Sequence, residues 1–399
     1  MSPPSSVPLS PPLSAPLSAP HLLPGSAHFS VIEEPAYLPA GSGEHLYVDI
    51  EKEGLTTDQV AEALATACGK RDRDIGYAGR KDRHAITRQW FSIHFGDEAK
   101  LATLQERLPN GRVQVHGVAR HANKLRLGHL AGNRFVLGLA GDASGLAERL
   151  AKLAHEGIRN RFGAQRFGLH GATLALAKAW GAGQHQAAIA LIIDPTGGWK
   201  WGDELPSGFR HGPEGQALGA LRRGKDAAGA LHAAGDQLRK LAASAGQSAI
   251  FNAILDAREA AGLLHTLRLG DLGNTSRGAP FLVEADALDD TNRRAAAGVL
   301  DAFATAPLPG TQRLKPSPAI DAEERQWSAA TGVDWAWFGD GGELESPGER
   351  RPLLVPFRVA PSVRHEGDLT WVSFTLPSGS YATAVLEQVG VGIPEDRRG

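Results

Sequence analysis

One carboxylate stands at the tip of a charged loop between two predicted strands. Asp82 follows a short apolar segment, 75–78, and precedes a segment with alternating faces, 87–95. Its basic neighbours are Arg80, Lys81, Arg83 and His84. Nearby cations favour the ionised form of a carboxyl group, so we expect Asp82 to be an anion at neutral pH. It is therefore a candidate nucleophile for a nucleic-acid substrate. The alternative is a solvated turn whose charges pair with one another.

An amide and an aromatic side chain lie two residues apart where another strand is predicted to begin. Residues i and i+2 of a strand point to the same side, so Asn133 and Phe135 share a face. An amide that reads a base edge beside a ring that stacks on the base would hold a uracil. Taken alone, a phenylalanine such as Phe135 is more often a core residue than a base-stacking one.

Basic residues gather in two segments although the formal net charge is only −2. Segment 111–134, which contains Arg126, has no acidic residue, and segment 157–171 adds Arg161 and Arg166 with no acid. Such segments indicate local phosphate binding. A solvated basic face, or an interdomain hinge at 163–168, remains the alternative.

Other side chains that could be reactive are better explained by structural roles than by catalysis or metal binding. Asp72 and Asp74 are flanked by arginines, which favours surface ion pairs. The single cysteine, Cys68, lies at the apolar end of a predicted helix and reads as a structural residue. The histidines are scattered without a metal-binding spacing, so we expect no metal.

The predicted secondary structure differs between two parts of the sequence, and this difference indicates the fold. Before residue 159 strands outnumber helices: strands are predicted at 29–33 and 46–50, and a helix begins after a capping box at Thr56 and ends at Gly69. Further helices are predicted at 101–108 and after a cap at Ser144. This pattern predicts an α+β fold with a mostly antiparallel sheet.

Alanine-rich helical segments follow. They are predicted at 173–180, 184–193, 227–243, 247–261 and 290–303. Strands return only at 353–359 and 370–376, before a closing helix at 380–389. We therefore expect a disordered Pro/Ser-rich tail (1–26), a catalytic domain in two parts (27–158 and 356–391), a largely helical inserted domain (159–355) and a loose end (392–399).

The segments around these residues resemble one family. Ala78-Gly-Arg-Lys-Asp-Arg-His-Ala-Ile-Thr-Arg-Gln-Trp90 is similar to the signature of the TruD-type tRNA pseudouridine synthases. Segments 124–135, 160–168, 248–252 and 376–383 resemble further motifs of that family, in the same order.

The resemblance implies a function. It implies isomerisation of uridine to pseudouridine in tRNA, at position 13 in the D-stem region, without cofactor or metal. Asp82 matches the family's nucleophile, and Phe29, Asn133 and Tyr381 match residues that contact the target nucleotide, with Phe135 nearby. Arg80 and Lys81 would support Asp82 and the substrate, and Arg126, Arg161 and Arg166 would bind the RNA backbone. We expect a cytoplasmic monomer that binds tRNA and no membrane.

Two departures from the family pattern stand out. Tyr381 occupies a position where the family commonly has phenylalanine, and a leucine near Leu23 occupies that of a basic residue. Arg80, Lys81 or His21 would have to substitute for that residue, or activity would be reduced. The alternative function is therefore a catalytically weak tRNA-binding or tRNA-folding protein. A glycoside hydrolase would need a second carboxylate, which none of the basic motifs offers.

Overall fold

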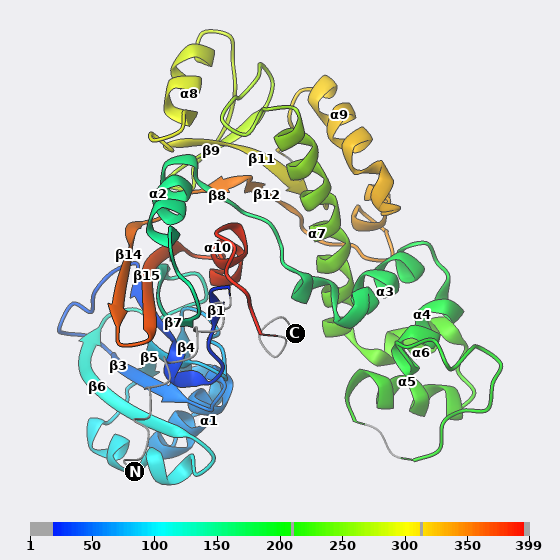
Figure 1. Cartoon of the computed structure of the whole chain (residues 1–399). Helices are drawn as coiled ribbons and strands as arrows, with labels where there is room; N and C mark the ends of the chain where they lie inside the picture. The colour runs from blue at the N-terminus through cyan, green and yellow to red at the C-terminus, as the bar shows by residue number, and fades with distance from the viewer. Residues whose placement is uncertain (1–18, 209–210, 312–313, 395–399) are drawn as a thin grey trace, which may run out of the picture.

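The computed structural model describes residues 19–208, 211–311 and 314–394. In Figure 1 a strand-rich part lies on the left, and a second part runs from above it to a cluster of helices on the right. The predicted tail falls largely outside the described residues, because 1–18 and 395–399 are not among them. Its last residues are ordered, in contrast to the prediction: β1 (His21–Leu22) pairs with a central strand, and Leu22 is fully buried.

A nine-stranded sheet dominates the first part, among the described residues. Its strands are β1, β2 (Phe29–Pro35), β3 (His45–Glu53), β4 (Ile75–Tyr77), β5 (Ile86–His94), β6 (Arg112–His121), β7 (Leu130–Ala140), β14 (Val359–Glu366) and β15 (Leu369–Pro377). The order is β14-β15-β7-β2-β5-β3-β6, with β1 beside β7 and β4 beside β5. β2 and β5 run parallel, and the other pairs are antiparallel. The α+β prediction with a mostly antiparallel sheet is confirmed.

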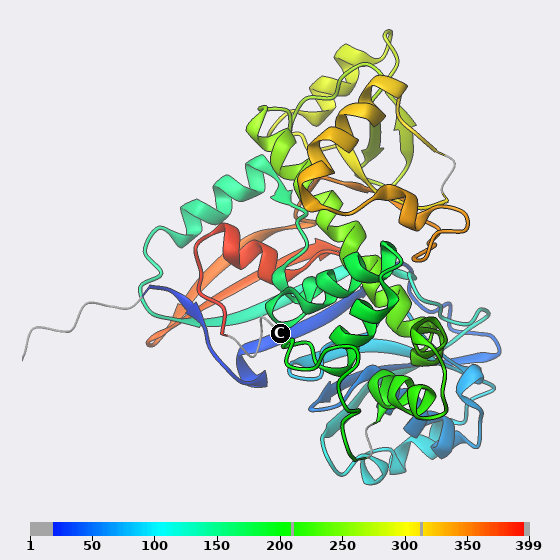
Figure 2. The ribbon, with the colours of Figure 1, turned by 90° about the vertical axis from the view of Figure 1, so that its right-hand side faces the viewer.

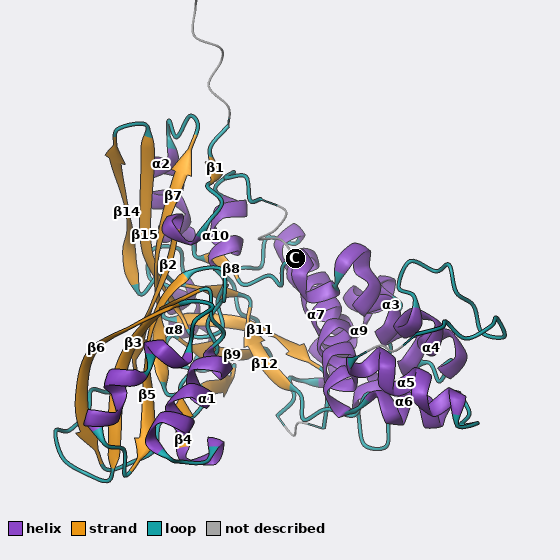
Figure 3. Ribbon diagram, turned by 90° about the horizontal axis from the view of Figure 1, so that it is seen from below, coloured by secondary structure: helices purple, strands orange, loops and turns teal. Residues whose placement is uncertain are grey.

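Three helices cover one face of this sheet: α1 (Thr57–Cys68), α2 (Leu146–Glu156) and α10 (Ala382–Gln388). The strand register places the residues that face them on a common side, because Val31 lies opposite both Thr87 and Phe135, and Phe135 lies opposite Phe374. Apolar residues on this side form the cores under α2 and α10 and under α1. Figure 3 shows α1 and α10 on the side of the sheet that faces the second part.

The second part is inserted at a short ribbon. β8 (Ile158–Arg159) leaves the first part and pairs with the returning β13 (Leu354–Val355). Between them lie α3 (Ala172–Gly181), α4 (His185–Ile193), α5 (Gly212–Arg222), α6 (Ala227–Ala234), α7 (Asp236–Ala260), α8 (Leu288–Ala295) and α9 (Pro318–Ser328). Viewed from the right of Figure 1, the green helices α3 to α6 lie in front of the sheet, and the yellow α8 and gold α9 lie above it (Figure 2). They share a single large apolar core.

The insertion also contains a sheet that the sequence does not predict. β9 (Leu272–Thr275), β10 (Pro280–Leu282), β11 (Ala302–Leu308) and β12 (Glu349–Pro352) pair in the order β10-β9-β11-β12. Segment 302–303 begins a strand, so the helix predicted at 290–303 is wrong beyond Ala295. β11 has the sequence Ala-Phe-Ala-Thr-Ala-Pro-Leu, and its alanines hide the strand because alanine favours helices.

Helix boundaries are correct where local capping decides them. Thr56 and Gln59 form the predicted capping box, and α1 ends at Gly69 in the left-handed conformation. The predicted break at 244–246 does not occur; the chain breaks at Gly235 (φ 97°) and α7 then runs unbroken. A Cβ at Gly246 would come within 2.9 Å of the Phe338 ring, so this glycine serves close packing instead.

Two local predictions before residue 159 are wrong. Segment 98–107 forms 3₁₀ turns rather than an α-helix. Ser144 does not cap α2, because its hydroxyl and N–H both donate to Asp142 and the cap position is Gly145. Among the described residues, no helix combines the length and apolarity that crossing a bilayer requires.

Candidate active site

Asp82 lies on the exposed loop between β4 and β5, as the sequence predicts. Its Oδ1 accepts a hydrogen bond from the His84 N–H at 2.8 Å, which fixes the carboxylate relative to its own loop. The side chain remains exposed, so a substrate can reach it.

The backbone of this loop is tied to the sheet and to α1. Gln89 on β5 donates to the Gly79 carbonyl at 2.9 Å, and the Lys81 N–H donates to the Thr57 hydroxyl at 2.9 Å. That hydroxyl in turn donates to Gln89 at 3.0 Å. Thr57 and Gln89 are both 1% exposed, and hydrogen bonds away from water hold a loop rigidly. The loop is therefore preorganised before substrate arrives.

Lys81 points into the protein and not toward the substrate side. Its ammonium lies 2.7 Å from Glu33 on β2 and donates to the Asn133 side-chain oxygen at 2.8 Å. The side chains of Lys81 and Glu33 are 5% and 1% exposed. Burial raises the pKa of the Glu33 carboxyl, and the attraction of Lys81 opposes that rise. Lys81 is thus the centre of a buried ion pair, and its contact with substrate stays a prediction.

Arg80 is also engaged, but at the surface. It pairs with Asp58 at the start of α1 at 3.1 Å, and Tyr77 donates to the same carboxylate at 2.6 Å. Its side chain is 68% exposed, so this pair leaves the guanidinium accessible.

Lys52 binds the loop that carries Asp82, and the sequence analysis did not identify it. It is therefore the candidate to replace the basic residue that the family has near Leu23. Its ammonium donates to the Asp82 carbonyl at 3.0 Å and to the Leu55 carbonyl at 2.7 Å, and the residue is 1% exposed. Burial lowers the pKa of Lys52 to about 8, while attraction to Asp82 raises it and repulsion from Lys81 lowers it further. The signal that could have found it is a lone lysine on the inward face of a strand, three residues before Leu55.

His21 cannot take that place. It lies opposite Ala140 on β7, whereas Asn133, which binds Lys81, lies seven residues away on the same strand. Seven residues of strand span roughly 23 Å. Leu23 also lies at that far end, where its N–H donates to Gly138.

The aromatic residues assigned to the target base share the face that carries Asn133. Phe29 lies opposite Leu137, and Asn133 opposite Glu33, which leaves Phe29, Phe135 and Asn133 on one side. Phe29 and Phe135 make an edge-to-face contact with ring centroids 6.5 Å apart, and each is 7% exposed. Phe135 also packs on Phe374 at 5.6 Å. Both rings are largely buried in the core, and their contact with the target nucleotide stays a prediction.

Tyr381 and Arg166 meet where the two parts of the chain adjoin. Tyr381 precedes α10, and its hydroxyl accepts a hydrogen bond from Arg166 at 2.9 Å. Arg166 also donates to Ser244 on α7 at 3.0 Å. The two residues line a cavity of about 610 Å³ together with Phe162, Gln165 and Leu241 among others. This volume lies within the usual range for small-ligand sites.

The other arginines assigned to RNA binding are separated. Arg161 forms an ion pair with Asp256 on α7. Arg126 is exposed on the loop between β6 and β7. The structure therefore does not gather Arg126, Arg161 and Arg166 into one cluster.

Alternative chemistries find little support among the described residues. No group of three or more His, Cys, Asp and Glu side chains there is arranged to hold a metal ion. Asp74 pairs with Arg71, as expected for a surface ion pair. Cys68 is a buried free thiol, and burial raises its pKa, which disfavours the reactive thiolate.

Comparison with known proteins decides the family. The sequence model of "tRNA pseudouridine synthase D (TruD)" matches residues 24–198 and 198–389. The chain belongs to the TruD family. A tRNA pseudouridine synthase D of Geobacter metallireducens is 39% identical over 387 residues, covering 91% of this chain and 93% of that protein. One of Geobacter sulfurreducens is 37% identical over 384 residues, covering 90% and 91%.

A solved structure supports the fold of this TruD family member. The crystal structure of a candidate tRNA pseudouridine synthase D from Methanosarcina mazei aligns with a TM-score of 0.69 at 24% identity. The alignment covers 94% of each chain, so it includes the inserted part as well as the sheet.

Proposed function

We propose that this chain converts uridine to pseudouridine in tRNA, at position 13 in the D-stem region, with Asp82 as its nucleophile. The observation that carries the proposal is the anchored loop that presents Asp82 in a chain of the TruD family. The relatives that support the substrate class are named tRNA pseudouridine synthases.

The reaction needs one nucleophilic carboxylate and no external reagent. The N1–C1′ bond of uridine breaks, either through attack of Asp82 on C1′ or with its help as uracil leaves as an anion. The base rotates and C5 attacks C1′, which releases the Asp82 carboxylate where an ester had formed; C5 then loses a proton and N1 gains one, so the composition is unchanged. The Lys52 ammonium beside the Asp82 carbonyl stabilises negative charge on this loop.

The target base must leave its stack to reach Asp82. We assign Asn133 to a base edge, because Lys81 occupies its oxygen and so fixes the orientation of the amide. Phe29 and Phe135 would form the apolar floor beneath it, and Tyr381 would offer an exposed ring at 39% exposure. Arg80 is the accessible cation of the same loop.

The tRNA would lie between the two parts of the chain. We divide the chain at the β8–β13 ribbon into a catalytic domain, 27–158 with 356–391, and an inserted domain, 159–355. The separate apolar cores of the two parts support this division. Arg161 and Arg166 lie close to this junction and would meet the RNA backbone there. A tRNA substrate also supports a cytoplasmic location, and we retain the monomer as the working assembly.

A direct test is to incubate the protein with an unmodified tRNA transcript and to map pseudouridine by chemical derivatisation. We expect one modified position, residue 13, without added metal or cofactor. Binding of the transcript without any pseudouridine would contradict the proposal and favour a tRNA-binding protein.

A further inference from the structure

A small basic pocket lies outside the site described above. Its lining residues are Tyr37, His121, Asn123, Lys124, Arg126 and His129, and its volume is about 400 Å³. None of the six carries a carboxylate, and five of them come from the acid-free segment 111–134. We propose that this pocket binds a backbone phosphate of the tRNA at a distance from the target uridine. The inference rests on the proposed tRNA substrate and adds a second contact point to it.

The walls of the pocket are built and held by hydrogen bonds. The Tyr37 and His121 rings stack with centroids 5.1 Å apart, and the Tyr37 hydroxyl is 2.8 Å from His129 Nδ1. Beneath them Tyr47 donates to the Asn123 carbonyl at 3.0 Å, and burial raises the pKa of Tyr47, which keeps this donor protonated. The backbone around the pocket is therefore fixed by side chains from two other segments.

The polar groups of the pocket suit an anion. The Ala40 N–H donates to His121 Nδ1 at 3.2 Å, so a neutral His121 carries its proton on Nε2 and is a donor there. The Lys124 ammonium donates one hydrogen bond to the Arg73 carbonyl at 2.6 Å. Its two other N–H groups can bind an anion in the pocket. Arg126 is exposed at the rim and can bind a phosphate with two N–H groups.

The pocket is close enough to Asp82 for one RNA to reach both. The Gly128 N–H donates to the Ala78 carbonyl at 2.8 Å, which seats the pocket loop against β4. Ala78 precedes Asp82 by four residues, so their Cα atoms lie at most about 15 Å apart. Tyr47, beneath the pocket, alternates along β3 with Leu46 and Val48 of the core under α1, so the pocket lies on the opposite face of the sheet. A tRNA that places its target base at Asp82 would therefore reach Arg126 by extending past the end of β4.

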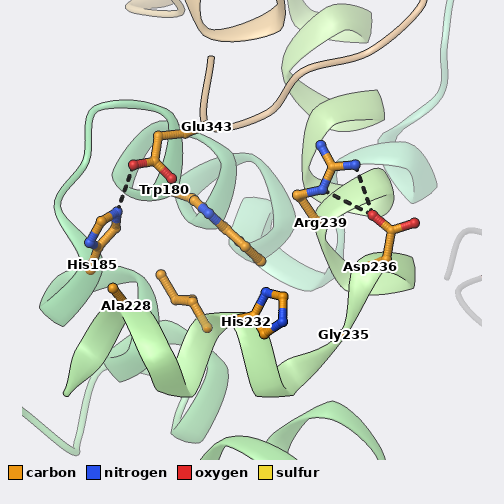
Figure 4. A pocket seen from close by; sticks show the side chains of 9 residues that line it. Trp180, His185, Ala228, His232, Gly235, Asp236, Arg239 and Glu343 are labelled. Atoms are coloured by element: carbon orange, nitrogen blue, oxygen red, sulfur yellow. Dashed lines mark hydrogen bonds and ion pairs between the residues drawn. The ribbon is translucent and has the colours of Figure 1, made fainter. Parts of the chain in front are cut away.

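A cavity in the inserted domain has a similar volume of about 410 Å³, but its lining includes carboxylates and is not purely basic. Figure 4 shows a basic side chain beside each of its two carboxylates: His185 lies 2.9 Å from Glu343, and Arg239 lies 2.8 Å from Asp236. Two carboxylates in its lining would repel a phosphate. Charge complementarity thus favours phosphate binding in the pocket at Arg126 over binding in this cavity.

The test compares Arg126→Gln with a matched control, Arg364→Gln. Arg364 is 68% exposed and lies on β14, at the opposite edge of the sheet from β6. Affinity for an unmodified tRNA transcript is measured by filter binding over a series of salt concentrations. We expect Arg126→Gln to weaken binding about tenfold and to reduce the salt slope by about 1, and the control to match the wild type. Unchanged affinity and slope for Arg126→Gln would overturn the proposal.

A second measurement identifies the phosphate. Transcripts with one neutral methylphosphonate linkage at successive positions are bound to both proteins. The wild type should lose affinity at a particular linkage to which Arg126→Gln is insensitive; equal losses in both proteins would contradict the pocket. Neither assay depends on turnover, so the absence of pseudouridine in a parallel wild-type reaction would contradict the proposed function and leave the binding result standing.

Discussion

At the scale of single residues, Asp82 depends on a lysine that the sequence does not associate with it. Lys52 is 30 positions away, on β3, and reaches the loop through the Asp82 carbonyl. A buried ammonium that donates to two carbonyls holds the loop in place and adds positive charge beneath Asp82, the proposed nucleophile. We propose that Lys52 takes the place of the basic residue that the family has near Leu23.

Replacing this lysine should slow the chemical step. For Lys52→Met we expect a single-turnover rate about 10²-fold below that of the wild type, because the loop loses both its tether and its charge. Lys52→Arg should recover part of that loss. A Met variant as fast as the wild type would remove Lys52 from the mechanism.

The pH dependence of the single-turnover rate distinguishes an effect of the Lys52 charge from an effect of its packing. Burial lowers the pKa of Lys52 to about 8, so the ammonium is present below that pH and is lost as pH rises through it. Wild-type single-turnover rates should therefore fall above about pH 8. The Lys52→Arg variant should lack this fall, because arginine remains protonated.

At the scale of elements, the loop between β4 and β5 is fastened by a buried ion pair and by a surface one. Lys81 and Glu33 are almost fully enclosed, whereas Arg80 and Asp58 are more than half exposed. We therefore expect the ion pairs of Lys81 and Arg80 to differ strongly in how much their loss changes the free energy of unfolding.

Removing each cation tests that difference. Lys81→Met should destabilise the protein by about 3–5 kcal/mol, because Glu33 is left buried without a partner. Adding Glu33→Gln should restore part of the loss. Arg80→Gln should cost less than about 1 kcal/mol. Chemical denaturation measures all three, and equal losses for Lys81→Met and Arg80→Gln would contradict the assigned burial.

Sequence patterns predicted elements whose signals are local. The capping box of α1 and the position of Asp82 between two strands depend on neighbouring residues, and both appear as predicted. The inward turn of Lys81 toward Glu33, and the approach of Lys52, depend on the pairing of β2, β3 and β5. Alanine-rich β11 was missed because burial between other elements outweighs its helix propensity.

At the scale of the whole molecule, several hydrogen bonds join the segment around α10 to the insertion, including two between Gln388 and the backbone of Arg159. The Tyr381 hydroxyl accepts from Arg166, which also binds Ser244 on α7. Arg351 reinforces the junction by donating to the Gly379 carbonyl at 3.0 Å. These hydrogen bonds connect the two parts of the chain.

The proposed role of Tyr381 is that of a ring. Tyr381→Phe keeps the ring and removes one hydrogen bond, worth about 0.5–1.5 kcal/mol, so its single-turnover rate should stay within about threefold of the wild type. Tyr381→Ala should be slower by at least about tenfold. If the Phe variant were as slow as the Ala variant, the hydroxyl and its bond to Arg166 would be the essential feature.

The most direct test of the whole account is single-turnover pseudouridine formation by Asp82→Asn on an unmodified tRNA transcript. The substitution keeps the size of the side chain and removes the anion. We predict a rate at least about 10³-fold below the wild type, with tRNA affinity within a few-fold. Pseudouridine formation at the wild-type rate by Asp82→Asn would contradict it.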